Sequence, residues 1–221
     1  MDGDRILVTG GLSGIAQGVV ARHPQRCVVW SRRANGVDVT DASSVQRAAE
    51  GFLREHGAPF AIVHGVGDFE ERPLLQTDDA LWRQMLDGNL TSAFLVARAL
   101  VPAMCTARRG RVIFFSAAGA EDRTAKTRAP AYFAAKAGLT SLARSLAKEV
   151  APHGVTVNVI APGIIRHDHS HAASQDRMQS RVPLGRAGEV RDLLGAIDLL
   201  LSDAGSYVTG DVWTVDGGLS L

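Results

Sequence analysis

Two residues that could move a proton lie one helical turn apart. Tyr132 and Lys136 are separated by three residues in an alanine-rich stretch, and positions i and i+4 share one face of a helix. A free phenol has a pKa of about 10, which is too high for acid–base work near neutrality. A nearby ammonium favours the phenolate and lowers that pKa toward the working range of a general acid or base. The chain has only two tyrosines and three lysines, so few other pairs could do this chemistry.

A glycine-rich turn follows the first apolar run of the chain. Glycines allow a tight turn and close backbone approach to a ligand, and the helix that follows offers free N–H groups to a phosphate. The spacing differs from the usual G-x-G-x-x-G, and Ala16 takes the place of the small residue that lets helix and strand pack closely. The alternative is a plain turn that binds nothing. The candidate phosphate-binding residues are Gly10, Gly11, Leu12, Ser13, Gly14 and Ile15.

The end of the second apolar run bears on the choice of cofactor. An acidic residue there would bind the ribose 2′-hydroxyl of NAD, but Arg32 and Arg33 follow residues 27–30 instead. Guanidinium groups suit a 2′-phosphate through charge-assisted bonds. The pattern therefore favours NADP(H), with NAD(H) still possible, and the alternative is that both arginines are simply solvated.

Short apolar runs alternate with segments of helical period, which predicts an α/β fold. We expect a single Rossmann-type domain over residues 1–221, with a doubly wound parallel sheet of about seven strands and helices on both faces. A helix capped by Asp41 or Ser43 is expected at 43–56, and one near 78–108 should be kinked or broken at Pro102. The other expected helices are 130–150 and 189–201, and the strands are 6–8, 27–30, 60–63, 112–115, 155–160 and 212–215.

Composition and charge exclude several classes of protein. The 24 basic and 23 acidic residues nearly cancel, so we expect neither nucleic acid nor an anionic membrane surface as a partner. Cys27 and Cys105 are the only cysteines, which excludes a disulfide scaffold and predicts a reducing compartment. We see no apolar run near the ~20 residues of a membrane span and no signal peptide. The cytoplasm is the expected location.

Taken in order, the motifs resemble those of the short-chain dehydrogenase/reductase family, especially the 3-oxoacyl-ACP reductases. The resemblance covers almost the whole chain, and each piece alone is weak. It rests on Thr9-Gly10-x-x-x-Gly14-Ile15-Ala16, Asp38-Val39-Thr40-Asp41, Asp87-Gly88-Asn89-Leu90, residues 110–119 ending in the Ser116 segment, Tyr132-x-x-x-Lys136, Asn158 to Gly163, Pro183-Leu184-Gly185-Arg186 and Val215-Asp216-Gly217-Gly218.

The resemblance implies roles for four residues. Tyr132 donates a proton to a carbonyl oxygen in reduction, or removes one in oxidation, while Lys136 lowers its pKa and bonds the nicotinamide ribose. Ser116 hydrogen-bonds the substrate oxygen, and Asn89 holds a water that links Lys136 to solvent. Outside this family a serine at a strand end more often caps a turn, and a helical asparagine more often bonds backbone or water.

The resemblance also implies further cofactor contacts and an overall activity. Besides Tyr132 and Lys136, the expected cofactor-binding residues are Asp38 and Val39 near the adenine, His64 and Gly65 after the third strand, and Pro162, Gly163 and Ile165 beside the nicotinamide. The implied reaction is hydride transfer between NADP(H) and a ketone or secondary alcohol, with reduction of a 3-oxoacyl or related carbonyl as the leading expectation. The alternatives are an NAD(P)-dependent alcohol dehydrogenase of a specialised pathway (sugar, steroid or secondary metabolite) and a non-catalytic cofactor-binding regulator.

Three places depart from the family pattern. His64-Gly65-Val66-Gly67 stands where Asn-Asn-Ala-Gly is usual, which leaves the loop's support for the sheet open, and His167 stands where a threonine often binds the cofactor. The stretch from Ser116 to Tyr132 is longer than is common, and its charged part, 121–128, should lie over the substrate site.

The segment 164–186 has no clear period and is expected to form a substrate lid. Its alternating histidines, His167, His169 and His171, could suggest a metal, but we expect none. The apolar residues on several faces of the helices near 78–108 and 130–150 need a further partner. With the family resemblance, this predicts a homotetramer or a homodimer acting on a small-molecule carbonyl or alcohol.

Overall fold

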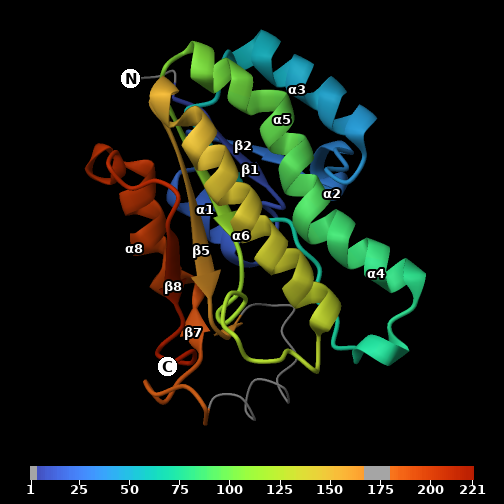
Figure 1. The fold of residues 1–221 in the computed structure, drawn as a ribbon. Coiled ribbons are helices and arrows are strands. Elements are labelled where there is room, and N and C mark those ends of the chain that lie inside the picture. Colours follow the sequence, from blue (N-terminus) through green and yellow to red (C-terminus); the bar gives the residue numbers. More distant parts are fainter. Residues whose placement is uncertain (1–3, 167–179) are drawn as a thin grey trace.

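A computed structural model describes residues 4–166 and 180–221 of the chain. One parallel six-stranded sheet runs through the molecule in the order β2-β1-β3-β4-β5-β8 (Figure 1). This confirms the expected doubly wound α/β fold. The strands are β1 (Ile6–Thr9), β2 (Cys27–Trp30), β3 (Ala61–His64), β4 (Gly110–Phe115), β5 (Val155–Pro162) and β8 (Val212–Val215).

The sheet has six strands rather than about seven because the connection after β2 is short. A parallel neighbour needs a crossover of a dozen or more residues, usually with a helix. Between β2 and the next long helix the chain forms only α2 (Arg32–Asn35), which has four residues. No room remains for another strand there, so β2 is the edge of the sheet.

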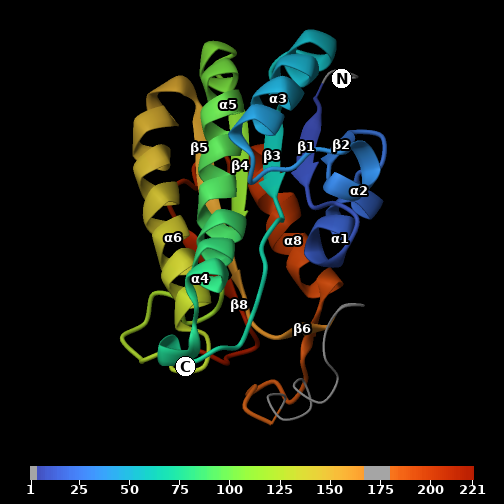
Figure 2. The ribbon, with the colours of Figure 1, turned by 90° about the vertical axis from the view of Figure 1, so that its right-hand side faces the viewer.

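Helices cover both faces of the sheet, as Figure 2 shows. On one face, α3 (Ala42–His56), α5 (Ser92–Thr106) and α6 (Pro130–Val150) pack on side chains such as Leu7 and Phe114. On the other face, α1 (Gly14–Arg22) and α8 (Val190–Leu201) pack on alternate residues such as Val8 and Ile113. The Asp41 carboxylate accepts from the Ser44 N–H and caps α3, which decides between the two expected caps.

The long helical stretch before β4 is interrupted, but not at the expected place. It consists of α4 (Asp79–Leu86), a π-helical turn over Asp87–Thr91 that we call the π-turn, and then α5. The expected break at Pro102 is wrong, because α5 runs through this residue. Pro102 itself is exposed, while its neighbours Val101 and Met104 are buried in the core and hold the helix despite the missing hydrogen bond.

The helical run Asp79–Thr106 is long and apolar enough to cross a membrane by length and composition alone. Its apolar window is 56% buried inside the fold. Within α5, Leu95, Val96 and Leu100 belong to the core shared with α3 and α6. The apolar character of this run is therefore explained by packing inside the domain.

Two short strands frame the expected lid. β6 (Ile165–Arg166) pairs in parallel with β7 (Gly188–Glu189), and Arg186 donates to both carboxylate oxygens of Asp192 at 2.6 and 2.9 Å. Most of the lid, including His167, His169 and His171, lies outside the described residues. Three single turns of 3-10 helix, Leu74–Gln76, Ala151–His153 and Asp203–Gly205, complete the described elements.

Candidate active site

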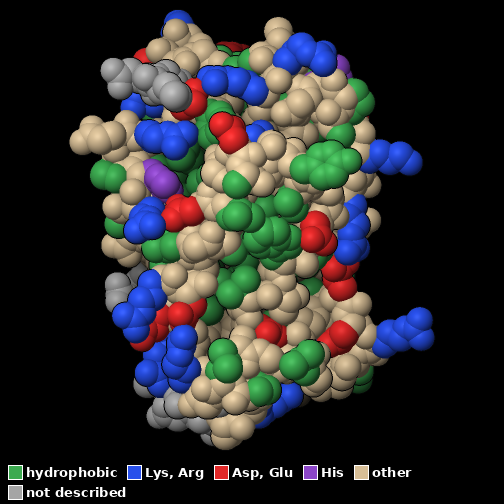
Figure 3. Space-filling view, turned by 90° about the vertical axis from the view of Figure 1, so that its left-hand side faces the viewer, with side chains coloured by type: hydrophobic (Ala, Val, Ile, Leu, Met, Phe, Trp, Pro, Cys, Tyr) green, Lys and Arg blue, Asp and Glu red, His purple; other side chains and the backbone are tan. Residues whose placement is uncertain are grey.

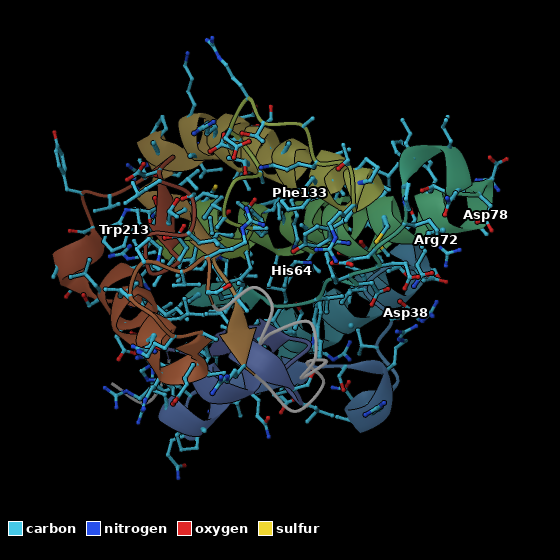
Figure 4. All side chains as sticks on the ribbon, turned by 90° about the horizontal axis from the view of Figure 1, so that it is seen from below. Asp38, His64, Arg72, Asp78, Phe133 and Trp213 are labelled. Atoms are coloured by element: carbon cyan, nitrogen blue, oxygen red, sulfur yellow. The ribbon has the colours of Figure 1, made fainter. Side chains whose placement is uncertain are left out.

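The candidate residues gather where the parallel strands end. Figure 4 looks onto this edge of the sheet and shows His64 at its centre, between the helix layers. Loops at the carboxyl ends of parallel strands are the usual ligand site of open α/β sheets. The glycine-rich turn, Asn89, Ser116 and the start of α6 all border this edge.

Tyr132 and Lys136 lie on the same face of α6, as the spacing predicted. The Lys136 Nζ sits 5.6 Å from the centre of the Tyr132 ring and donates to the Phe115 carbonyl oxygen at 2.7 Å. Lys136 is almost fully buried. The start of α6 is fixed by Pro130 at its first turn, where a proline is favourable.

The acidity of this pair differs from the sequence expectation. Burial raises the pKa of Tyr132 to about 12, and burial lowers the pKa of Lys136 to about 8. The expected lowering of the Tyr132 pKa by Lys136 is therefore wrong, because desolvation of the buried phenol raises this pKa. At neutral pH the phenol is protonated and able to donate.

Ser116 directly follows β4, and its hydroxyl bonds to the backbone of Lys136. Its N–H donates to the Ile160 carbonyl at 2.8 Å, and its hydroxyl donates to the Lys136 carbonyl at 3.2 Å. The Thr140 hydroxyl lies 3.3 Å from the Ser116 hydroxyl and 3.1 Å from the same carbonyl. Sequence reasoning missed Thr140, although it is one further turn along the face that carries Tyr132 and Lys136.

Asn89 is presented by the π-turn. Its Nδ2 donates to the carbonyl oxygens of Asp68 at 2.9 Å and Met85 at 3.0 Å, while its buried Oδ1 has no partner within the described part of the chain. Gly67 lies directly against both groups: a Cβ there would be 2.6 Å from the Asn89 Oδ1 and 3.1 Å from the Lys136 Nζ. A buried acceptor without a partner is a group that an ordered water commonly satisfies.

The His64 side chain is engaged by hydrogen bonds within the protein. Its side chain is buried, its Nδ1 lies 2.9 Å from the Thr9 hydroxyl, and its Nε2 lies 3.0 Å from the Ser92 hydroxyl. Both ring nitrogens are bonded inside the protein, so neither is free to bond a cofactor, and the expected cofactor contact at His64 stays a prediction. From the end of β3, the imidazole instead hydrogen-bonds Thr9 of β1 and Ser92 at the start of α5. The histidine that replaces the usual asparagine therefore still supports the sheet.

The glycine-rich turn has the geometry that a close phosphate contact requires. Gly10 has φ +71°, and a Cβ there would lie about 3.1 Å from Val66 and Gly65. A Cβ on Gly65 would lie 2.6 Å from the Ala16 Cβ, so α1 packs closely against the residue that follows β3. Ser13 makes no side-chain cap on α1, and no acid lies in the first turn. The free N–H groups of α1 fit an anion such as a pyrophosphate.

Arg32 and Arg33 begin α2, shortly after the end of β2, and both residues are exposed. Ser31 caps the short helix by accepting from the Ala34 N–H. The Arg32 Nη1 lies 3.9 Å from the Asp38 carboxylate. Hydrogen bonds from Thr40 and the nearby Arg32 lower the pKa of Asp38. Arg33 is exposed, while Val39 turns its side chain into the core, so of this residue only the backbone is available to a ligand.

The end of β5 completes the site. The Pro162 carbonyl accepts from the Ala118 N–H at 2.9 Å, and the Gly163 N–H donates to Val215 at 3.0 Å. Gly163 must lack a side chain, because a Cβ would lie 2.7 Å from the Asp216 Cα. Ile165 follows in β6 at the entrance to the expected lid.

The charged segment 121–128 is tied down by ion pairs. Arg128 contacts Glu71 at 2.5 Å, and Arg144 of α6 donates to both carboxylate oxygens of Glu121. The Glu71 contact joins this segment to the loop after β3, whose exposed Phe69 packs edge-on to Tyr132 with ring centres 4.9 Å apart. Among residues 4–166 and 180–221, no group of three or more His, Cys, Asp or Glu side chains could hold a metal ion.

The amino-acid sequence matches a known protein family and several curated proteins. Residues 19–220 match a family model described as "Enoyl-(Acyl carrier protein) reductase". The 3-oxoacyl-acyl-carrier-protein reductase FabG of Escherichia coli K12 is 36% identical over 194 residues, covering 84% of this chain and 78% of that protein. FabG of Pseudomonas aeruginosa is 30% identical over 245 residues, covering 99% and 98%.

Solved structures share the fold. Gox2181 has a TM-score of 0.89 at 26% identity, covering 100% of this chain and 96% of that one. A 4-hydroxyisoleucine dehydrogenase complexed with NADH has a TM-score of 0.89 at 22% identity and covers 98% of both chains. The chain belongs to the short-chain dehydrogenase/reductase family, whose members are oxidoreductases that use a pyridine nucleotide on CH–OH and C=O groups.

Proposed function

We propose that this protein reduces a ketone with NADPH, and that Tyr132, Lys136, Ser116 and Asn89 are its catalytic residues. The observation that carries the proposal is the pairing of a protonated phenol with a buried ammonium beside Ser116. This set of groups can give a proton to a carbonyl oxygen and stabilise the charge that develops on it.

When bound, the nicotinamide supplies the hydride. The chain's own residues do the rest. The Ser116 hydroxyl, which in the structure points at the Lys136 carbonyl, turns to hydrogen-bond the substrate oxygen. Tyr132 gives its phenolic proton to that oxygen as the C–O bond is reduced. Lys136 stabilises the resulting phenolate, and its proton replaces the one that was given.

Proton return is the proposed task of Asn89. Its unpartnered Oδ1 and the Lys136 Nζ both lie beside Gly67, and a water held by the Oδ1 could bring a proton from solvent to the neutral Lys136 amine after Lys136 has reprotonated Tyr132. The turnover of a ketone should therefore fall as the pH rises through the pKa of Lys136 near 8, because the neutral amine no longer stabilises the phenolate.

The NADP(H) preference is supported by charge. The exposed guanidinium groups of Arg32 and Arg33 stand at the end of β2, where a 2′-phosphate would gain charge-assisted bonds. Asp38 lies beside Arg32 but takes hydrogen bonds from Thr40. The glycine turn, Gly65, the Val39 backbone and the Pro162–Ile165 segment are the proposed remaining cofactor contacts.

A 3-oxoacyl thioester is the proposed substrate class, supported by the printed names of the FabG relatives. The test is steady-state turnover of a 3-oxoacyl thioester with NADPH and with NADH, alongside a panel of secondary alcohols with the oxidised cofactors. Faster reduction with NADPH supports the proposal. Faster oxidation of an alcohol with NAD would instead favour the specialised dehydrogenase, and no turnover with tight cofactor binding would favour the regulator.

We also propose a cytoplasmic homotetramer or homodimer. Figure 3 shows hydrophobic side chains gathered in the middle of the face formed by α8 and β8. Exposed Leu199 and the partly exposed Trp213 lie on these elements. Light scattering after gel filtration tests this proposal, and a monomer at all concentrations would overturn it.

A further inference from the structure

We infer that His64 is a positioning residue for the catalytic centre, holding Asn89 in place through the Ser92 hydroxyl. The inference rests on the proposed function, because it gives a role to the Asn89 that the proposed proton path uses. Within the described part of the chain, no hydrogen bond joins the His64 side chain to Tyr132 or Lys136.

A chain of three buried hydrogen bonds carries the inference. The Ser92 hydroxyl donates to the Gly88 carbonyl at 2.8 Å, so its one proton is used and it can only accept from His64. The His64 Nε2 must therefore carry a proton and donate, at 3.0 Å. The Nδ1 is then unprotonated and accepts from the Thr9 hydroxyl at 2.9 Å. The bonds agree with one neutral tautomer and leave neither ring nitrogen unpaired.

The Ser92 hydroxyl compensates for the irregular backbone at this point. In the π-turn the Ser92 N–H donates to the Asp87 carbonyl, five residues back. The bond from position 92 to the Gly88 carbonyl, four residues back, is made by the side chain instead. The Ser92 hydroxyl thus stabilises the wider π-turn, and the hydrogen bond from His64 keeps this hydroxyl in its orientation. Asn89 lies inside this turn, which holds its Oδ1 beside Gly67, where the Lys136 Nζ also lies.

The surroundings keep the imidazole neutral, which the network requires. The Phe114 ring lies edge-on with its centre 6.1 Å away. Burial and the positive charge of Lys136 lower the pKa of His64 to about 3. A protonated imidazole could not accept from Thr9, and the buried charge would have no counterion among these neighbours.

The test combines a direct view of the network with kinetics. In ¹⁵N NMR of the wild type, with the His64 signal identified by its loss in His64→Gln, we expect a neutral ring protonated at Nε2 at slightly acid pH. In a crystal structure of Ser92→Ala, we expect the π-turn to relax and Asn89 to turn away from Lys136. Both measurements are independent of turnover, so they decide the inference even if the proposed reaction fails.

In kinetics, Ser92→Ala should lower kcat by about tenfold or more, with the KM for NADPH nearly unchanged. Ile197→Val in the core of α8 is the matched control, since it destabilises the fold without touching the π-turn. A His64 ring protonated at Nδ1, an unmoved Asn89 in Ser92→Ala, or a kcat equal to that of Ile197→Val would each overturn the inference.

Discussion

The catalytic side and the nucleotide side of the site are built differently. Ser116, Lys136 and Asn89 are each less than 5% exposed and donate hydrogen bonds to backbone carbonyl groups of the surrounding protein. On the nucleotide side the Arg32 side chain is 75% exposed, with one weak ion pair. Buried and bonded groups keep their geometry before a ligand arrives, whereas exposed charges adapt to it. The reaction is therefore expected to be hard to alter by mutation and the choice of cofactor easy.

The largest expected effect comes from removing the proton donor. Tyr132→Phe keeps the ring that packs against Phe69 but deletes the hydroxyl, so kcat for ketone reduction should fall roughly 1,000-fold. Steady-state kinetics measures the loss, and NADPH binding followed by fluorescence should be unchanged. Near wild-type turnover would show that Tyr132 is not the donor.

The next largest effect is expected at Gly67, which lies against both Asn89 and Lys136. Gly67→Ala would place a Cβ 2.6 Å from the Asn89 Oδ1, which displaces either the amide or a water, and kcat should fall about 10- to 100-fold. Gly195→Ala is the matched control, because a Cβ on that exposed helical glycine meets nothing within 4 Å. Equal activity of both variants would argue against a water path at this point.

A smaller effect is expected on the nucleotide side. Replacing Arg32 and Arg33 together by alanine should raise the KM for NADPH about tenfold or more, since hydrogen bonds to charged groups are worth about 1.5–3 kcal/mol. The KM for NADH should change little. Arg54→Ala on the exposed side of α3 controls for loss of charge. An equal rise of the KM for NADPH and for NADH would show that Arg32 and Arg33 do not recognise the 2′-phosphate.

The smallest effect is a dependence of stability on pH. His64 has a folded pKa of about 3 and an unfolded one of about 6.5, so below the unfolded value only the unfolded chain binds this proton. The contribution of His64 to the free energy of unfolding is therefore complete above about pH 6.5. It falls by about 1.4 kcal/mol for each pH unit below this value. Urea denaturation near pH 7 and pH 5 should show a loss about 2 kcal/mol larger in wild type than in His64→Gln. Equal losses would mean that His64 is charged in the folded protein.

Sequence patterns predicted the regular elements well because these depend on local periodicity. The α6 range 130–150 and the β8 range 212–215 agree with the structure, and the shared face of Tyr132 and Lys136 follows from helix geometry alone. The predicted break at Pro102 is wrong because burial of neighbouring side chains outweighed the preference of a single residue, while a kink there stays a prediction. The absence of a seventh strand could have been inferred from the sequence, because the segment between β2 and α3 is short.

The amino-acid sequence by itself determined the α/β class, the glycine turn, the arginines after β2 and the family, since all of these lie in short continuous motifs. The tertiary structure alone decided the role of His64, the π-turn at Asn89 and the acidity of Tyr132. The His64 ring bonds residues 55 and 28 positions away, and the pKa of Tyr132 depends on what surrounds it. Such contacts and the exclusion of water arise only when distant segments meet, so no local pattern could specify them.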